Sequence, residues 1–200
     1  MIAIIDYGVG NLFSLTSSFN AIGVKAVVTS DKKVIESADK IIFPGVGAFG
    51  DASKKLIESG LDKVVKEQAK LGKPLLGVCL GMQMLFDKSF EYGEHQGLGL
   101  ISGKVVAFDL PKEYKIPHIG WNALHFVKAN PLLKYLSDGD FVYFVHSYHA
   151  VDCKESLVAT SEYGIEVTAI VNKDNVYGCQ FHPEKSGDVG LKILKAFCEL

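Results

Sequence analysis

A cysteine with a glycine two positions away on either side lies in the turn formed by residues 77–81, Gly-Val-Cys-Leu-Gly. A strand-like segment, residues 73–78, precedes this turn, and residues 82–86 follow it with helical spacing. A nucleophile between a strand and a helix is the arrangement of a nucleophile elbow, here with Cys79 at the apex. Flanking glycines avoid collisions with the neighbouring strand and helix, and a helix N-terminus favours the thiolate. Cys79 is therefore a candidate nucleophile, although a buried structural cysteine would also fit this stretch.

A thiolate nucleophile needs a base that exchanges a proton with it, and the base needs a partner that orients it. His182 closes the strand-like run of residues 176–181, and Glu184 follows it after one proline. Residues two apart on an extended segment point the same way, so the Glu184 carboxylate can reach the far ring nitrogen of His182. Together with the elbow, this pair predicts a triad of Cys79, His182 and Glu184. In isolation, the tripeptide would indicate only a turn.

Attack on a carbonyl group also requires hydrogen-bond donors for the oxyanion. The backbone N–H of Leu80, directly after the nucleophile, is one candidate donor. The second is expected from a neighbouring strand end, where Gly45 and Gly47 leave the chain free to turn the N–H of Val46 inward. A tight strand-to-helix turn would explain these glycines equally well.

The composition is that of a globular protein with a sizeable core, because 48% of the residues are hydrophobic and 22% are charged. The net charge of −2 gives no electrostatic argument for nucleic acid or for an anionic membrane surface as a partner. All 21 basic residues are lysines, so an anion site must use lysine or backbone N–H groups. A length of 200 residues predicts one domain over residues 1–200.

The four cysteines show no CxxC spacing, which favours reduced thiols in a cytoplasmic protein over disulfides or a metal site. The N-terminus lacks the basic region of a signal peptide, and no apolar stretch approaches the roughly 18 residues of a membrane span. We therefore expect a cytoplasmic protein without a membrane anchor.

Strand and helix patterns alternate up to the cysteine turn. Helical spacing covers residues 12–22, 30–38 and 52–71, the last with a break near Gly60, and short apolar runs predict strands at residues 1–6, 24–29, 40–43 and 75–78. This order predicts a parallel, doubly wound sheet with ligands at the carboxyl ends of its strands. The glycine loop at residues 7–11 begins like a dinucleotide fingerprint, but Phe13 stands where the third glycine belongs, which disfavours nucleotide binding.

The second half has short strands separated by turn signals, and a closing helix that starts near residues 186–189. The predicted strands are residues 104–108, 123–127, 141–145, 157–161, 167–171 and 176–181. We expect an antiparallel layer, some of whose strands add to the central sheet. The predicted fold class is thus α/β: an open, mainly parallel doubly wound sheet with helices on both faces and an added antiparallel layer.

The cysteine turn and the His-Pro-Glu segment together resemble the class I (triad) glutamine amidotransferases, whose fold is flavodoxin-like. Five further stretches resemble one branch of this family, the glutaminase subunits of imidazole glycerol phosphate synthases: residues 6–12, 44–50, 117–122, 143–148 and 183–186. The resemblance runs from the first predicted strand to the last predicted helix.

The resemblance implies that Cys79 attacks the carboxamide of glutamine and releases ammonia, leaving a glutamyl thioester that water hydrolyses. It gives His182 and Glu184 the roles of base and orienter, and assigns the oxyanion hole to the N–H groups of Val46 and Leu80. The substrate-binding residues that it implies are Gly47, Gln83, Glu91, His146, Ser147 and Tyr148.

The resemblance also implies a heterodimer with a (β/α)₈-barrel cyclase subunit, which Asn11, Trp121, Tyr143 and Lys185 would face. Ammonia would pass through that barrel to a phosphoribosyl-formimino carboxamide nucleotide, giving imidazole glycerol phosphate and an aminoimidazole carboxamide ribotide in histidine biosynthesis. No metal or organic cofactor is implied.

Because ammonia made without a docked acceptor is wasted, we expect the loop around Val46 to present its N–H only when the partner is bound. We expect Trp121 in a surface loop, although a core aromatic would also fit.

Three alternatives remain open from the sequence. Other amidotransferases, such as the glutaminases of anthranilate synthase and pyridoxal phosphate synthase or a γ-glutamyl hydrolase, fit residues 117–122 and 143–148 poorly. A paralogue that feeds ammonia to a related barrel outside histidine biosynthesis would have nearly the same motifs. An inactive partner-binding module is disfavoured, because Cys79, His182 and Glu184 are all present.

Overall fold

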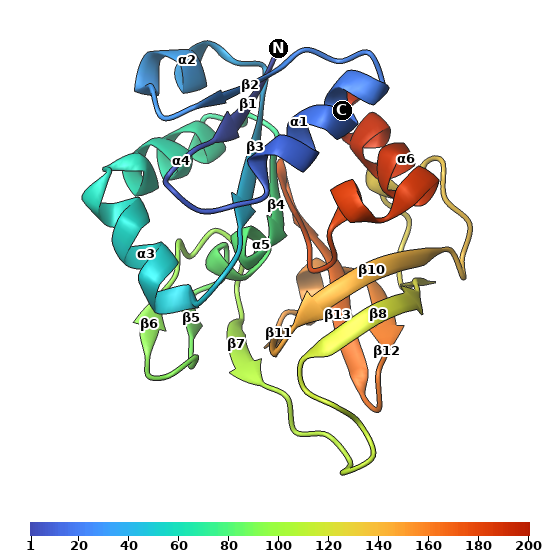
Figure 1. Ribbon diagram of the computed structural model, residues 1–200. Coiled ribbons are helices and arrows are strands. Elements are labelled where there is room, and N and C mark those ends of the chain that lie inside the picture. Colours follow the sequence, from blue (N-terminus) through green and yellow to red (C-terminus); the bar gives the residue numbers. More distant parts are fainter.

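The computed structural model describes residues 1–200 and is built on an eight-stranded sheet with helices on both faces (Figure 1). Five strands run parallel, in the order β2 (Ala26–Thr29), β1 (Ile2–Ile5), β3 (Lys40–Gly45), β4 (Leu75–Cys79) and β14 (Val176–Cys179). Three antiparallel strands complete the sheet beyond β14: β13 (Glu166–Lys173), β12 (Leu157–Glu162) and β9 (His125–Phe126). The predicted doubly wound, mainly parallel sheet is therefore confirmed.

Alternation along β1 explains how one sheet carries two cores. Ile2 and Ile4 pack into the core under one face, while Ala3 and Ile5 pack into the core under the other. The first face is covered by α1 (Leu12–Ala21) and α6 (Gly187–Cys198), and the second by α2 (Lys32–Ser37), α3 (Phe49–Glu58) and α4 (Leu61–Lys70). The predicted break near Gly60 separates α3 from α4, and Gly60 has a φ of 71°. None of the helices is long and apolar enough to span a lipid bilayer.

Two smaller sheets accompany the main sheet. One pairs β10 (Phe141–His146) with β8 (His118–Ala123), and the other contains β11 (Tyr148–Val151), β7 (Lys104–Ala107), β5 (Lys88–Ser89) and β6 (His95–Gln96). Three single-turn 3₁₀ helices complete the fold: η1 (Pro131–Leu133), η2 (Lys154–Ser156) and η3 (Pro183–Lys185).

The expectation of a loop around Trp121 is wrong, because Trp121 lies on β8 and faces Tyr143 of β10 across an antiparallel ladder. Likewise, the single strand expected at residues 123–127 is divided, and β8 ends at Ala123 before β9 begins at His125. Gly120, with a φ of 149°, is in the middle of β8. Because glycine is unfavourable inside a strand, the sequence around it does not predict one. The pairing with β10, a tertiary contact, holds this segment extended.

The turn at the end of β4 brings the backbones of β3 and of the five-residue helix α5 (Leu80–Met84) into contact. Cys79 at its apex has φ 54° and ψ −112°, a strained conformation for a residue with a side chain. A Cβ on Gly81 would lie 1.9 Å from the carbonyl oxygen of Phe43 in β3, and one on Gly77 would lie 2.8 Å from the Gly81 carbonyl oxygen. Glycine is therefore required on both sides of the strained cysteine.

Gly81→Ala should lower the free energy of unfolding by more than about 3 kcal/mol, because the new methyl group overlaps the rigid backbone of β3 at Phe43. Gly23→Ala is the control, since Gly23 has open space around its Cβ position, so an added methyl group there meets no neighbouring atom and costs only the strain of its positive φ (73°). Its expected cost is about 1 kcal/mol. Urea unfolding of both variants measures the difference, and equal costs would contradict the close packing of Gly81 against β3.

Candidate active site

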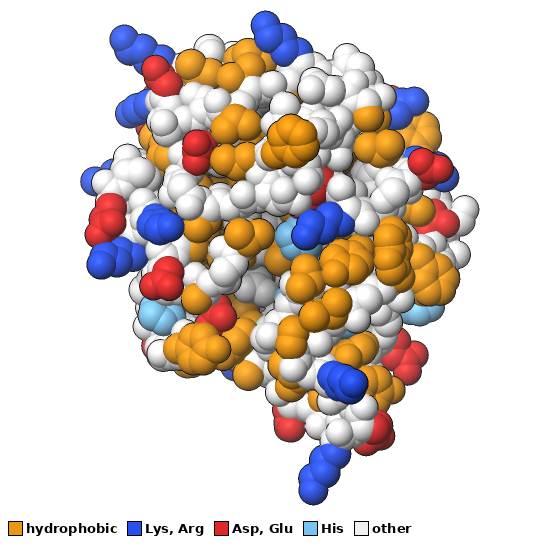
Figure 2. Space-filling model, in the orientation of Figure 1, with side chains coloured by type: hydrophobic (Ala, Val, Ile, Leu, Met, Phe, Trp, Pro, Cys, Tyr) orange, Lys and Arg blue, Asp and Glu red, His pale blue; other side chains and the backbone are white.

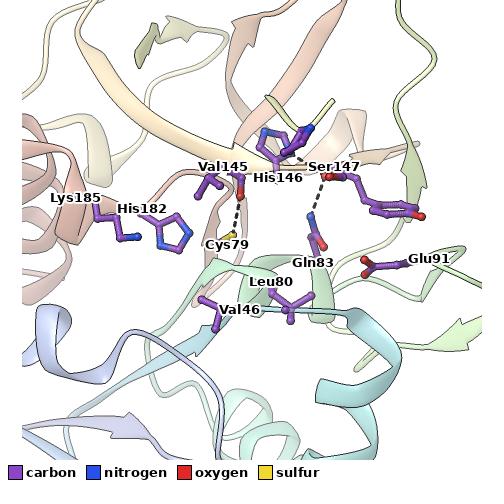
Figure 3. Close-up of a pocket in the computed structure, with 13 residues that line it drawn as sticks. Val46, Cys79, Leu80, Gln83, Glu91, Val145, His146, Ser147, His182 and Lys185 are labelled. Atoms are coloured by element: carbon purple, nitrogen blue, oxygen red, sulfur yellow. Dashed lines mark hydrogen bonds between the residues drawn. The ribbon is translucent and has the colours of Figure 1, made fainter. Parts of the chain in front are cut away.

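A pocket of about 410 Å³ lies at the carboxyl ends of β3 and β4 (Figure 3). The structure brings most of the predicted site residues together here, although their segments are far apart in the sequence. The lining residues are Val46, Gly47, Cys79, Leu80, Gln83, Glu91, Pro117, Val145, His146, Ser147, Tyr148, His182 and Lys185. Glu184 is not exposed to the pocket and lies behind His182.

His182 and Glu184 form a buried pair at the end of β14. The His182 Nδ1 lies 2.8 Å from Glu184 Oε1, and the side chains are 3% and 1% exposed. The backbone holds this geometry, because the His182 N–H donates to the Tyr143 carbonyl oxygen at 3.0 Å, and the Ser186 hydroxyl donates to the His182 carbonyl oxygen at 2.6 Å. Figure 3 shows the His182 ring beside the Cys79 sulfur.

The electrostatic surroundings favour a charged His182. Burial alone would lower the pKa of His182, but its interactions with the Cys79 sulfur and the Glu184 carboxylate raise it to about 10. Glu184 Oε2 has no hydrogen-bond partner in the protein, and the Asn11 side-chain amide lies 3.5 Å from Oε1. Asn11, predicted at the partner interface, therefore also contacts the carboxylate that orients His182.

Backbone donors are available where the oxyanion hole is predicted. Val46 directly follows β3 and Gly47 has a φ of 89°, and no hydrogen bond within the protein occupies the N–H of either residue. Leu80 is the first residue of α5, directly after the sulfur-bearing Cys79. All three residues line the pocket, so their N–H groups are candidates for binding an anionic oxygen.

Gln83 and Glu91 lie together on the side of the pocket away from Lys185 (Figure 3). The Gln83 amide nitrogen donates to the Tyr148 carbonyl oxygen at 2.9 Å, whereas its own oxygen accepts no hydrogen bond from the protein. Glu91 Oε2 accepts a hydrogen bond from the N–H of Phe49 at 2.7 Å. Burial raises the pKa of Glu91, although that hydrogen bond opposes the shift. A free carbonyl oxygen and a carboxylate next to each other suit a ligand that carries N–H donors.

The rings of His118 and His146 connect β8 to the segment that follows β10. His146 Nδ1 lies 2.8 Å from the Tyr148 carbonyl oxygen, and its Nε2 lies 3.1 Å from His118 Nδ1. The remaining His118 nitrogen lies 2.9 Å from Asn122 Oδ1. Burial lowers the pKa of His118 and lowers that of His146 to about 3. At neutral pH, His146 therefore donates from Nδ1 to the Tyr148 carbonyl, so the His146 ring positions the pocket-lining Tyr148.

Three of the predicted interface residues meet near the pocket. Trp121 is 51% exposed and its ring lies 6.0 Å from that of Tyr143, whose face is 6.0 Å from Lys185 Nζ. Ile119 and Phe141, which belong to no predicted site, are 55% and 56% exposed on the same two strands. Alternation at every second position of β8 and β10 is the signal that would have identified them. Figure 2 shows hydrophobic side chains gathered over β8 and β10 beside the pocket.

Two groups close to the Cys79 sulfur are also absent from the predicted site. The Val145 carbonyl oxygen lies 4.0 Å from Sγ, and the side-chain amide nitrogen of Gln180 lies 3.8 Å away. Every residue has a main-chain carbonyl group, so the sequence could not have predicted the position of the Val145 carbonyl. Gln180 could have been identified, since it is a polar residue in an apolar strand end, two positions before His182.

Glu184→Gln should lower the pKa of His182 from its value of about 10, because the variant removes the negative charge next to Nδ1. Since the folded-state pKa is raised, the stability gained from charged His182 is complete below its usual pKa of about 6.5. It is lost as the pH rises through about 10. NMR titration of the ring protons and urea unfolding over this window check both effects. Glu155→Gln, far from the pocket, is the control, and an unchanged His182 titration in Glu184→Gln would contradict the coupling.

The family model described as "Glutamine amidotransferase class-I" matches residues 3–199. Among curated relatives, "Imidazole glycerol phosphate synthase subunit HisH" of Caldanaerobacter subterraneus is 53% identical over 100% of this chain and 98% of its own length. The protein of the same name from Wolinella succinogenes is 48% identical over 100% of both chains.

Solved structures agree with the fold. A crystal structure titled as a glutamine amidotransferase superposes with a TM-score of 0.77 at 19% identity, covering 99% of this chain and 100% of that one. PurLQS from Thermotoga maritima gives a TM-score of 0.75 at 18% identity, covering 99% of this chain and 97% of that one. The chain therefore belongs to the class I glutamine amidotransferases and, within them, to the family of imidazole glycerol phosphate synthase subunit HisH.

Proposed function

We propose that this chain hydrolyses glutamine to glutamate and ammonia, as the glutaminase subunit of an imidazole glycerol phosphate synthase in histidine biosynthesis. The observation that carries the proposal is the buried pair of His182 and Glu184 beside Cys79, in a pocket that also contains the residues predicted to hold glutamine. Membership of the HisH family supports the same function over the full length of the chain.

In the proposed reaction, the Cys79 thiolate attacks the carboxamide carbon of glutamine and a carbon–sulfur bond forms. The N–H groups of Val46 and Leu80 stabilise the resulting oxyanion. His182, charged at neutral pH, gives its proton to the departing nitrogen, so ammonia leaves and a glutamyl thioester remains. His182 then takes a proton from a water molecule, which attacks the thioester and releases glutamate and the Cys79 thiolate. Glu184 holds the His182 ring throughout.

The substrate would lie between the sulfur and the pair formed by Gln83 and Glu91. The Glu91 carboxylate suits the α-ammonium group, and the unpaired Gln83 oxygen can accept a hydrogen bond from the substrate. The main chain of Ser147 and Tyr148 would line the opposite wall. The free N–H of Gly47 adds a further donor for the substrate or the oxyanion.

The partner proposed for this chain is a (β/α)₈-barrel cyclase that docks on β8 and β10. Exposed apolar side chains beside a pocket mark a protein interface, and Lys185 adds a positive charge at its edge. In this arrangement, ammonia formed at Cys79 would leave toward the barrel.

We also propose that residues 1–200 form one domain, since the main sheet takes strands from both halves of the chain. A cytoplasmic location is proposed because all four cysteines are unpaired.

Glutamine hydrolysis should rise strongly when the cyclase subunit and its nucleotide ligand are added to the purified chain. The reason is that the loop around Val46 is expected to present its N–H to the oxyanion only when the partner is docked. The assay measures glutamate release by the chain alone, with the partner, and with both partner and ligand. Cys79→Ala should be silent in every condition, because it removes the nucleophile.

The other outcomes of this assay separate the alternatives. Hydrolysis that ignores the partner indicates a stand-alone hydrolase, and no hydrolysis in any condition indicates an inactive binding module. Stimulation by a related barrel, but not by the histidine-pathway cyclase, indicates a paralogue.

Gly47→Pro should abolish the stimulation by the partner. Proline holds φ near −65°, whereas Gly47 has a φ of 89°, so the loop loses the conformations that can present the Val46 N–H. Gel filtration with the cyclase shows whether the variant still forms the complex, and glutamate release measures the stimulation. Unchanged stimulation in the Gly47→Pro complex would refute a moving oxyanion loop.

A further inference from the structure

Gln180 is a buried polar residue whose side chain contacts the nucleophile. It lies between β14 and His182 with 0% of its surface exposed, and its N–H donates to the Ala169 carbonyl oxygen at 2.9 Å. Its side-chain nitrogen lies 3.8 Å from Cys79 Sγ. A buried amide is costly unless its hydrogen bonds are made, so the sulfur contact requires an explanation.

The neighbouring hydrogen bonds determine which end of the Gln180 amide faces the sulfur. The Tyr148 carbonyl oxygen can only accept, so the Gln83 group 2.9 Å away must be its NH₂. The same NH₂ lies 3.0 Å from Gln180, whose facing atom must therefore be the acceptor Oε1. The Gln180 NH₂ is consequently the group directed at Cys79.

The sulfur needs such a donor when it is ionised. Besides His182, its other polar neighbour is the Val145 carbonyl oxygen at 4.0 Å, which can accept a hydrogen bond from a thiol but repels a thiolate. Cys79 is only 7% exposed, so little water is available to solvate the charge. In such surroundings a hydrogen bond to an ionised group is worth more than one between neutral groups.

We propose that Gln180 is a further catalytic residue, whose amide N–H donates a hydrogen bond to the Cys79 thiolate. This inference rests on the proposed glutaminase function and adds a second group, besides His182, that stabilises the sulfur anion. The same N–H faces the sulfur when the thioester breaks and Cys79 leaves as a thiolate. Gln83 acts as a positioning residue here, because it holds the Gln180 amide in the required orientation.

The test measures the rate of Cys79 alkylation by iodoacetamide as a function of pH, because only the thiolate reacts. Mass spectrometry of the Cys79 peptide separates its reaction from that of the other three cysteines. Gln180→Met removes the donor at similar volume. Gln180→Glu keeps an oxygen that accepts from Gln83 but puts an acceptor next to the sulfur. Gln68→Met, at a buried glutamine of α4, is the matched control.

We expect the pH midpoint of alkylation to move upward in Gln180→Met, so that the reaction at pH values below the wild-type midpoint is roughly tenfold slower, and to move further in Gln180→Glu. Gln68→Met should react like the wild type. A midpoint equal to that of the wild type in either folded Gln180 variant, checked by circular dichroism, would overturn the proposal. Alkylation needs no glutamine, so wild-type glutaminase assays test the proposed function separately.

Discussion

The close contact between the backbones of β3 and α5 is the constraint on which the site depends. It exists because Gly81 leaves room for the Phe43 carbonyl, and it keeps Cys79 in a left-handed conformation between a strand and a helix. The same contact places the loop after β3 against the turn that carries the sulfur. The candidate nucleophile and the candidate oxyanion donors of Val46 and Leu80 are therefore positioned by one packing interaction. The stability of the surrounding sheet offsets the energetic cost of the strained Cys79 backbone.

The second organising feature is the way in which buried charge is compensated. The chain has no arginine, and the pocket contains a single lysine, Lys185. The charge of the Glu184 carboxylate is balanced by His182, which remains protonated to about pH 10. The proposed thiolate is balanced by the same imidazolium and by the neutral amide of Gln180. A neutral donor such as Gln180, which Gln83 holds in place by a hydrogen bond, can stabilise an anion in a poorly solvated site without adding a second positive charge.

The sequence predicts the parallel half of the fold well because its signals are local. Buried strands such as β1 and β4 are short apolar runs. The glycines on either side of Cys79 stand where a side chain would collide with neighbouring backbone, and Gly60 stands at the predicted break between two helices. The site residues are predicted through short motifs, and the structure brings most of them to one pocket, although their roles remain predictions. The extent of β8 is predicted wrongly because only its tertiary pairing with β10 makes it a strand.

Contacts that join distant segments have no signature in a single sequence. The link between His118 and His146 crosses two strands, and the direction of the Gln180 amide depends on the Tyr148 carbonyl and on Gln83. The most direct test of the proposed chemistry is mass spectrometry of the wild-type complex, quenched with acid during turnover of isotopically labelled glutamine. If the reaction passes through a glutamyl thioester on Cys79, the peptide that contains this residue will carry a labelled glutamyl group. Steady turnover with the label absent from Cys79, or carried by another residue, would contradict covalent catalysis at the elbow.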